Sequence, residues 1–351
     1  MAAQGTVGRA DAFQRRHRWL GIPIATIYKY GDDQGTYLAV IVTYYALLAV
    51  LPLLLLATSI LGFVLQGNPD LQRKVIDSTL AQFPIIGTQL NLPEGLRGST
   101  AGIVVGALVA IYGCLGLGQS VQNALNIAWS VPRNSRPNPV LLRLRSLLLL
   151  VTAGVAVLAV SSLSVLGSNT QVFGRDIDAT LRAVIQLATV LVNGTVLTLL
   201  FRLGSAREHR FRFAAPGGFS VSVMWLALQY GGALYVTQVL AKAGPVNKTF
   251  GLVLGMIGLI YIAAVMGVLG MEINVVLARR LWPRALLTPF TDNVDLTEAD
   301  KRAYAGYARA QRHKGFEHVE VRFLDRHGQV PDAPDALELE SEDDDGADHL
   351  P

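Results

Sequence analysis

Few residues of this chain have a type and position that suggest chemistry, and the clearest is an acid within an apolar run. Glu272 lies in "GVLGMEINVVLARR" (residues 267–280), with apolar stretches before and after it. An ionisable side chain is costly in hydrocarbon, so an acid in such a run marks a functional site by default. A carboxyl group in a low-dielectric site favours its neutral form, which suits proton coupling. We therefore take Glu272 as the candidate titratable centre of an ion or lipid pathway.

Other catalytic arrangements are missing from the sequence. The histidines lie outside the apolar runs, and neither an HExxH or Cys/His zinc pattern nor a GxSxG nucleophile pattern occurs. The sole cysteine, Cys114, lies in an apolar run, so no intramolecular disulfide can form. We expect the chain to be no enzyme and to hold neither a metal ion nor a cofactor.

The composition is that of a membrane protein. Hydrophobic residues make up 51% of the chain, charged residues 16%, and the mean hydropathy is +0.39. Soluble globular chains carry about 25% charged residues. A helix of roughly 20 apolar residues crosses the hydrocarbon core. Segments of that length are 38–65, 100–121, 146–168, 182–203, 218–240 and 251–277. We expect an all-α polytopic membrane protein with six transmembrane helices.

The distribution of lysine and arginine predicts the orientation. Arginines are frequent before the first run, in the second and fourth connections and after the sixth run, and the alternate connections are poorer in them. By the positive-inside rule both termini lie in the cytoplasm, and the protein lies in the plasma (inner) membrane. Trp19, Trp129 and Trp282 fall at the predicted cytoplasmic boundary, where indole side chains favour the headgroup level. These arginines abut membrane spans, so we predict membrane lipids and no nucleic acid as partners. The oligomeric state stays open.

Further polar residues lie within the predicted spans. Together with Glu272 they form a candidate substrate or ion cavity open to the cytoplasm: Asn274, Tyr44, Tyr45, Gln119, Asn123, Asn193 and Gln229, the last two nearer the midplane. The alternative is structural, because tyrosines line membrane boundaries and Asn or Gln side chains form interhelical hydrogen bonds worth about 0.6–2 kcal/mol. Pro52, in the middle of the first span, predicts a kink or hinge.

The remaining segments lie outside the membrane. Residues 1–37 are a basic segment, either an amphipathic element on the inner leaflet or a solvated lead-in, because Gly21 and Pro23 interrupt any long helix. The loop after span one predicts a surface helix at 70–84. Residues 283–330 form a small cytoplasmic segment, with an Asp295–Glu298 capping box, a helix over 298–312 and a short strand in "EHVEVRF". The acidic tail, 331–351, is expected to be disordered.

Three stretches resemble hallmark sequences of the YihY/virulence factor BrkB family. They are "TYYALLAVLPLLLLATSILG" (43–62), "ALVAIYGCLGLGQSVQNALNIAWSVP" (107–132) and "VLGMEINVVL" (268–277). The matching residues are Tyr44, Tyr45, Pro52, Asn126, Trp129, Glu272 and Asn274, while Met271 and Ile273 replace the usual Ala and Leu. The resemblance implies a six-helix inner-membrane protein with an envelope role. Some members carry the name ribonuclease BN, but no nuclease constellation is present here.

Two functions remain from the sequence. The first is a transporter or lipid- or ion-handling protein with a cytoplasm-facing polar cavity around Glu272. The alternative is a non-transporting scaffold for the envelope, whose polar residues only lock the helices together. A membrane-embedded hydrolase is disfavoured because no second carboxylate accompanies Glu272 in the sequence. Glu272 lies at the inner edge of the core if span six begins at Phe250, or about two turns deeper if Trp282 marks the boundary.

Overall fold

The computed structural model describes residues 2–64, 100–168, 179–206, 210–240, 242, 245–292 and 294–324. Side chains near several helix ends, including those of residues 51–64, lie outside this description. The described chain is all-α. Its elements are α1 (Ala2–Arg16), α2 (Arg18–Asp32), α3 (Gly35–Val64), α5 (Thr100–Ala128), the 3₁₀ turn η2 (Arg133–Ser135), α6 (Pro139–Ser168), α8 (Ala179–Gly204), α9 (Phe211–Leu234), the π-helical turn η3 (Tyr235–Leu240), α10 (Pro245–Ala278) and α11 (Glu298–Ala310).

Long apolar helices occupy the apolar runs of the sequence. Three of them are long and apolar enough to cross a membrane: Gln186–Gly204 in α8, Phe211–Gln238 in α9 and η3, and Val253–Ala278 in α10. Gly35–Val50 in α3 is a shorter apolar helix. The predicted all-α class and the membrane-spanning character of these helices are confirmed. The helices α5 and α6 cover the second and third predicted runs.

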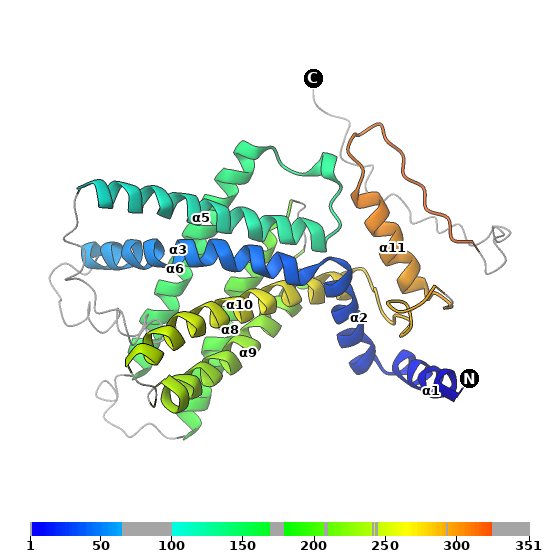
Figure 1. Cartoon of the computed structure of the whole chain (residues 1–351), viewed down its shortest axis with the longest axis horizontal. Coiled ribbons are helices and arrows are strands. Elements are labelled where there is room, and N and C mark those ends of the chain that lie inside the picture. Colours follow the sequence, from blue (N-terminus) through cyan, green and yellow to red (C-terminus); the bar gives the residue numbers. More distant parts are fainter. Residues whose placement is uncertain are drawn as a thin grey trace.

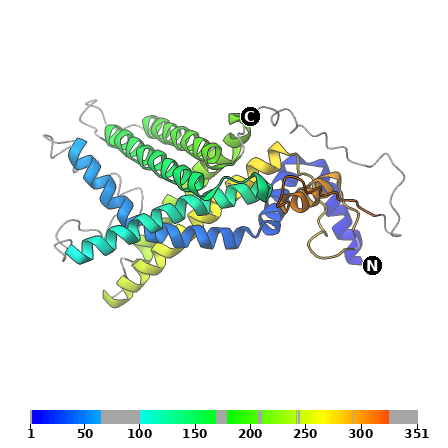
Figure 2. The same ribbon diagram turned by 90° about the horizontal axis from the view of Figure 1, so that it is seen from above.

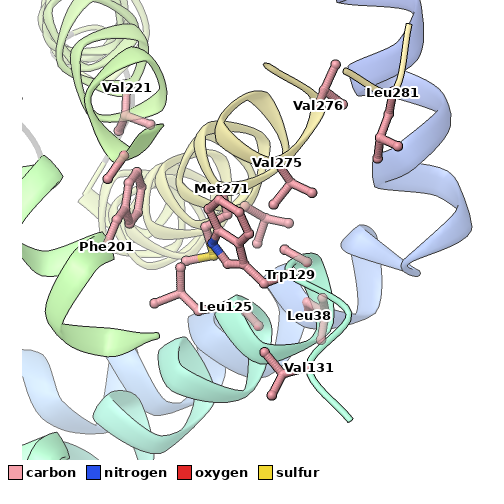
Figure 3. Packing of buried hydrophobic residues seen from close by; sticks show 14 of the residues in the cluster. Leu38, Leu125, Trp129, Val131, Phe201, Val221, Met271, Val275, Val276 and Leu281 are labelled. Atoms are coloured by element: carbon pink, nitrogen blue, oxygen red, sulfur yellow. The ribbon is translucent and has the colours of Figure 1, made fainter. Parts of the chain in front are cut away.

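The helix α10 lies at the centre of the arrangement. It packs against α9, α3, α2 and α5 (Figure 1). The side chains of Met271, Val275 and Val276 face a buried apolar cluster, which also contains Leu125 of α5 and Trp129, the residue after α5 (Figure 3). From this end the long helices extend away and spread apart (Figure 2). The tightest packing therefore surrounds the C-terminal half of α10, where Glu272 lies.

Two helices end in the same way at this packed end. Ser130 after α5 and Arg280 after α10 have φ values of 48° and 52°. The amide of Val131 donates to the Asn126 carbonyl over 2.8 Å, and that of Leu281 donates to the Val276 carbonyl over 3.0 Å. These are Schellman-type ends, each closely followed by a proline that cannot continue a helix. The chain therefore leaves both helices sharply at the same end of the structure.

The N-terminal helices and α11 gather at that end (Figure 1). Gly21 and Pro23 do not interrupt the N-terminal segment as predicted, since both lie inside α2, and the break falls at His17. The predicted helix over 298–312 is confirmed as α11, which ends at Ala310. Its capping box uses Thr297 and Asp300, so the predicted Asp295–Glu298 pair was wrong.

The predictions of a strand, a surface helix and a disordered tail remain to be compared with the structure. The strand predicted in "EHVEVRF" does not form, because residues 317–323 are irregular and have no neighbouring strand among the described residues. The predicted surface helix at 70–84 and the acidic tail 331–351 lie outside the described residues.

Candidate functional site

A tight turn between α2 and α3 places two charged side chains at the centre of the packed end. Gln34 adopts φ 55°, and the amide of Asp33 donates to the Lys29 carbonyl over 2.9 Å. A Cβ on Gly35 would lie 2.4 Å from the ring of Tyr30, so this position accepts only glycine without rearrangement. Because Lys29 and Asp33 are four residues apart across this turn, their side chains lie on the same side of it.

These two residues meet Glu272 of α10. The Lys29 ammonium pairs with Asp33, and its Nζ lies 3.5 Å from Glu272 Oε2. The side chains of Lys29 and Glu272 are 1% and 0% exposed, and Asp33 is also buried. We call Lys29, Asp33 and Glu272 the Lys29 cluster. It contradicts the sequence argument that no second carboxylate accompanies Glu272, since Asp33 is that carboxylate.

The charges of the Lys29 cluster do not balance when both acids are ionised. Two carboxylates and one ammonium leave one net negative charge in a buried site, which is strongly disfavoured. Neither Glu272 oxygen accepts a hydrogen bond from a described residue, although the Asp33 and Glu272 carboxyl groups interact directly. One proton shared by the two carboxyl groups makes the cluster neutral and links them. Burial raises the pKa of Asp33, against the opposing charge of Lys29.

Tyr307 of α11 covers the Lys29 cluster from the outside. Its ring centroid lies 5.0 Å from Lys29 Nζ, a cation–π arrangement. Its hydroxyl donates to Asp32 Oδ2 over 3.3 Å. Burial raises the pKa of Tyr307, and the nearby Asp33 and Asp32 carboxylates act in the same direction. Tyr307 therefore stays a neutral hydrogen-bond donor between the cluster and Asp32.

A second set of charges fixes α11 to the end of α10. We call Arg284, Asp300 and Asp32 the Arg284 cluster. The guanidinium of Arg284, which is fully buried, pairs with Asp300, and its Nη2 lies 3.1 Å from Asp32 Oδ2. Burial disfavours the charged guanidinium, but the hydrogen bond and charge of Asp300 hold the pKa of Arg284 above its usual value. Arg284 therefore stays charged beside its two carboxylates.

Backbone groups complete the Arg284 cluster. Asp300 Oδ2 accepts hydrogen bonds from the amides of Ala285 at 3.0 Å and Thr297 at 2.9 Å. The Arg284 carbonyl accepts from Gln14 Nε2 at 2.6 Å, which ties α1 to the same segment. Tyr307 links the two clusters, because its ring lies over Lys29 and its hydroxyl donates to Asp32, so they form one continuous polar region beneath α11.

The predicted site residue Asn274 lies beside Glu272 in sequence but has a different neighbour. Its Oδ1 accepts a hydrogen bond from the Gly217 amide of α9 at 2.6 Å. A Cβ on Gly217 would lie 1.9 Å from the Gly270 carbonyl oxygen, so α9 and α10 touch there backbone to backbone. Asn274 therefore holds two helices together at a close crossing and does not reach the Lys29 cluster.

The two predicted tyrosines lie on α3, away from the cluster. Tyr44 is 54% exposed, and its ring packs edge-on against Tyr45 with centroids 5.1 Å apart. A Cβ on Gly116 would lie 2.1 Å from the Tyr45 ring, so Tyr45 fills the crossing of α3 and α5. Pro52 falls within α3, but its side chain lies outside the described residues.

The predicted amide residues are spread over three helices. Asn123 is exposed on α5 and accepts a hydrogen bond from Arg136 Nη1 at 3.4 Å. Gln119 on α5, Asn193 on α8 and Gln229 on α9 are half-buried. Of the eight predicted cavity residues, only Glu272 takes part in the Lys29 cluster.

The three tryptophans differ in exposure. Trp19 is 67% exposed, whereas Trp129 is 5% exposed and packs in the core beneath Arg279. Arg279 Nη2 also donates to the Trp129 carbonyl at 2.6 Å. Arg18 lies over the half-buried ring of Trp282. Trp129 therefore packs inside the protein, and its predicted depth at the membrane boundary stays a prediction.

Sequence reasoning missed the partners of Glu272. From the sequence alone, no site role is predicted for Lys29, Asp33, Arg284 or Asp300. A signal was present in "YKYGDD" (28–33), which places a lysine and an aspartate at helical spacing just before the first apolar run. No group of three His, Cys, Asp or Glu side chains is placed to hold a metal ion among the described residues.

Comparison with known proteins adds the family. The family model described as "Virulence factor BrkB" matches residues 26–290, well over half of the chain. No curated protein and no solved structure matches. The matched range contains the whole Lys29 cluster and Arg284, and it ends before α11 begins. The chain belongs to the virulence factor BrkB family.

Proposed function

We propose that the protein is a six-span membrane transporter for ions or lipid-like molecules, with the Lys29 cluster as its proton-binding centre. The main support is that two carboxyl groups and one ammonium group are buried together at the end of the bundle. In addition, neither Glu272 oxygen accepts a hydrogen bond from a described residue. Such a set exchanges one proton between a charged and a neutral form at fixed geometry. Buried ionisable groups of this kind occur in proton relays of transporters.

The proposed topology has both termini in the cytoplasm. The helices α1, α2 and α11 gather at one end of the bundle, and Arg15, Arg16, Arg280 and other arginines belong to that end (Figure 1). By the positive-inside rule this is the cytoplasmic end. The Lys29 cluster then exchanges its proton with the cytoplasmic side.

The test is transport by purified protein in liposomes. Wild type, Glu272→Gln and Asp33→Asn are reconstituted, and proton-coupled flux of cations and movement of fluorescent lipids are followed under an imposed pH gradient. We expect flux in the wild type and a loss of roughly tenfold or more in each variant, because each removes one of the two groups that share the proton. Glu298→Gln is the matched control, since Glu298 is exposed and pairs with Lys301 on the surface of α11.

Two outcomes of the flux measurement would contradict different parts of the proposal. Flux that Glu272→Gln leaves unchanged removes the Lys29 cluster from the mechanism. Absence of flux in a folded, monodisperse wild type removes transport itself for the solutes tested.

A non-transporting scaffold is the second candidate function. It is favoured by the close crossing of α9 and α10, where Asn274 accepts from the Gly217 amide and Gly270 leaves no room for a side chain. Under this reading the buried charges fix one arrangement of helices. Reconstituted protein would then show no flux, and Glu272→Gln would change only the stability.

A further inference from the structure

We propose that α11 is a movable cover that closes the Lys29 cluster from the cytoplasm, with the Arg284–Asp300 ion pair as its latch. This inference rests on the proposed function, since it assigns to α11 the control of access to the proton-binding centre. Three independent features of the described residues carry it.

The first feature is that α11 provides the outer wall of the site. Tyr307 places its ring 5.0 Å from Lys29 Nζ and its hydroxyl against Asp32. Asp32 keeps 29% of its side-chain area exposed, whereas Lys29 and Glu272 are buried. Solvent therefore reaches Asp32 but stops at Tyr307. Displacement of α11 removes the aromatic cover from Lys29 and opens the cluster to water.

The second feature is the way in which α11 is held. Its fully or nearly fully buried apolar side chains are the alanines Ala299, Ala303 and Ala305. Alanine methyl groups contribute little burial energy, about 0.8 kcal/mol per buried CH₂ or CH₃ group. The polar attachments are Asp300 with Arg284, Arg302 Nη2 with the Arg280 carbonyl at 2.7 Å, and the Asn134 amide with the Arg312 carbonyl at 3.2 Å. Two partly buried rings add to them, since Tyr307 packs against the core and the centroid of Tyr304 lies 5.2 Å from the Arg284 guanidinium. Because the fully buried apolar side chains of α11 are all alanines, this helix can detach while the bundle stays folded.

The third feature is the position of α11 in the chain. The family match ends at residue 290, and α11 begins at Glu298. Arg284 and the Lys29 cluster lie inside the matched range, whereas Asp300 and Tyr307 lie outside it. Irregular chain joins α10 to α11, and Arg284 and Leu286 are anchored by Gln14 and Asp11. Displacement of α11 can therefore leave α10 in place.

A reversible disulfide tests whether closure stops function. In a Cys114→Ser background, Asn134→Cys and Arg312→Cys tie the C-terminal end of α11 to the turn after α5. A backbone hydrogen bond joins these residues, and Arg312 Nε donates to Asn134 Oδ1 at 3.4 Å, so the two side chains approach each other as a disulfide requires. We expect flux to fall roughly tenfold or more on oxidation and to return on reduction. Each single cysteine variant is the matched control. Oxidised, fully cross-linked protein that transports at the reduced rate overturns the inference.

A labelling experiment tests the latch without any transport readout. Ala303→Cys, also in the Cys114→Ser background, places a thiol on the buried face of α11. A membrane-impermeant maleimide added from the cytoplasmic side reports detachment of α11. We expect Asp300→Asn to raise the labelling rate roughly tenfold, because it weakens a charge-assisted hydrogen bond. Glu298→Gln is expected to leave the rate unchanged. An unchanged rate in a folded Asp300→Asn protein overturns the latch.

Different results would contradict the proposed transport function and the proposed movement of α11. If the protein transports nothing but Asp300→Asn exposes Ala303→Cys, α11 is a movable cover and the proposed function is wrong. If flux depends on Glu272 but neither the disulfide nor Asp300→Asn has an effect, the transporter stands and the cover does not. If Asp300→Asn prevents folding, the disulfide pair alone decides whether α11 must move.

Discussion

Lys29 Nζ lies 3.5 Å from Glu272 Oε2, and both side chains are shielded from solvent. The pair joins α2, which precedes the first apolar run, to the C-terminal half of α10 in the last one. A cation from the start of the family-matched range thus neutralises an acid near its end.

Lys29→Met is expected to destabilise the fold. The substitution leaves Asp33 and Glu272 buried without their cation, and breaking a buried pair by removal of one partner costs about 3–5 kcal/mol. The measurement is the free energy of unfolding of detergent-solubilised protein in denaturant. Lys242→Met is the control, since Lys242 is exposed and donates to Gln238, and such a change is worth about 0.5 kcal/mol or less. Equal stability of the two variants contradicts a buried role for Lys29.

Asp33→Asn is expected to flatten the pH dependence of stability. Burial raises the pKa of Asp33 in the folded state above its unfolded value. The folded protein therefore binds this proton more tightly than the unfolded chain, and its contribution is full below about pH 4, the ordinary pKa of aspartate. The contribution is lost as the pH rises through the raised, folded-state pKa. Asp33→Asn removes this decline.

Thermal unfolding of wild type and Asp33→Asn at a series of pH values measures the effect. The matched control is Asp292→Asn, because Asp292 is exposed. A wild-type stability that instead rises with pH across this window, relative to Asp33→Asn, shows that Asp33 is held ionised in the fold.

Gly217→Ala and Gly258→Ala are expected to have opposite effects. A Cβ at Gly217 would lie 1.9 Å from the Gly270 carbonyl oxygen, a backbone atom that cannot move aside without separating α9 from α10. A Cβ at Gly258 meets nothing within 4 Å. Alanine in a helix is favoured over glycine by roughly 0.5–1 kcal/mol, so Gly258→Ala is expected to stabilise slightly. Gly217→Ala is expected to lower the melting temperature sharply, and similar melting temperatures contradict the close crossing.

The helices were predictable because their signal is local. The long apolar runs set the positions of α8, α9 and α10, and the helix at 298–310 was predicted although its capping box uses Thr297 and Asp300. The strand expected in 317–323 does not form, because the local pattern of a strand is not sufficient to stabilise it. Alternating polar and apolar residues favour an extended chain, but a strand also needs a partner, and none of the described residues supplies one.

The candidate site was predictable only in part, because its partners are far apart in sequence. Glu272 stood out as an acid in an apolar run, but the need for a cation and for Asp33 beside it depends on how α2 packs on α10. Polar residues at the same predicted depth in the membrane do not all meet at one site. Asn274 and Glu272 lie at nearly the same depth, and their side chains point to different helices.

The proposed orientation predicts which surface residues are accessible from each side of the membrane. In a Cys114→Ser background, Ala12→Cys and Lys314→Cys report on the two ends of the chain, and Lys242→Cys reports on the connection between α9 and α10; all three positions are exposed. With intact cells and an impermeant maleimide, only Lys242→Cys is expected to react. Inverted vesicles are expected to give the opposite pattern. Labelling of Ala12→Cys and Lys314→Cys from opposite sides means an odd number of spans, because the chain changes side once with each crossing. Labelling of both from outside means that the arginine-rich end faces outward, which contradicts the positive-inside argument and removes cytoplasmic access to the Lys29 cluster.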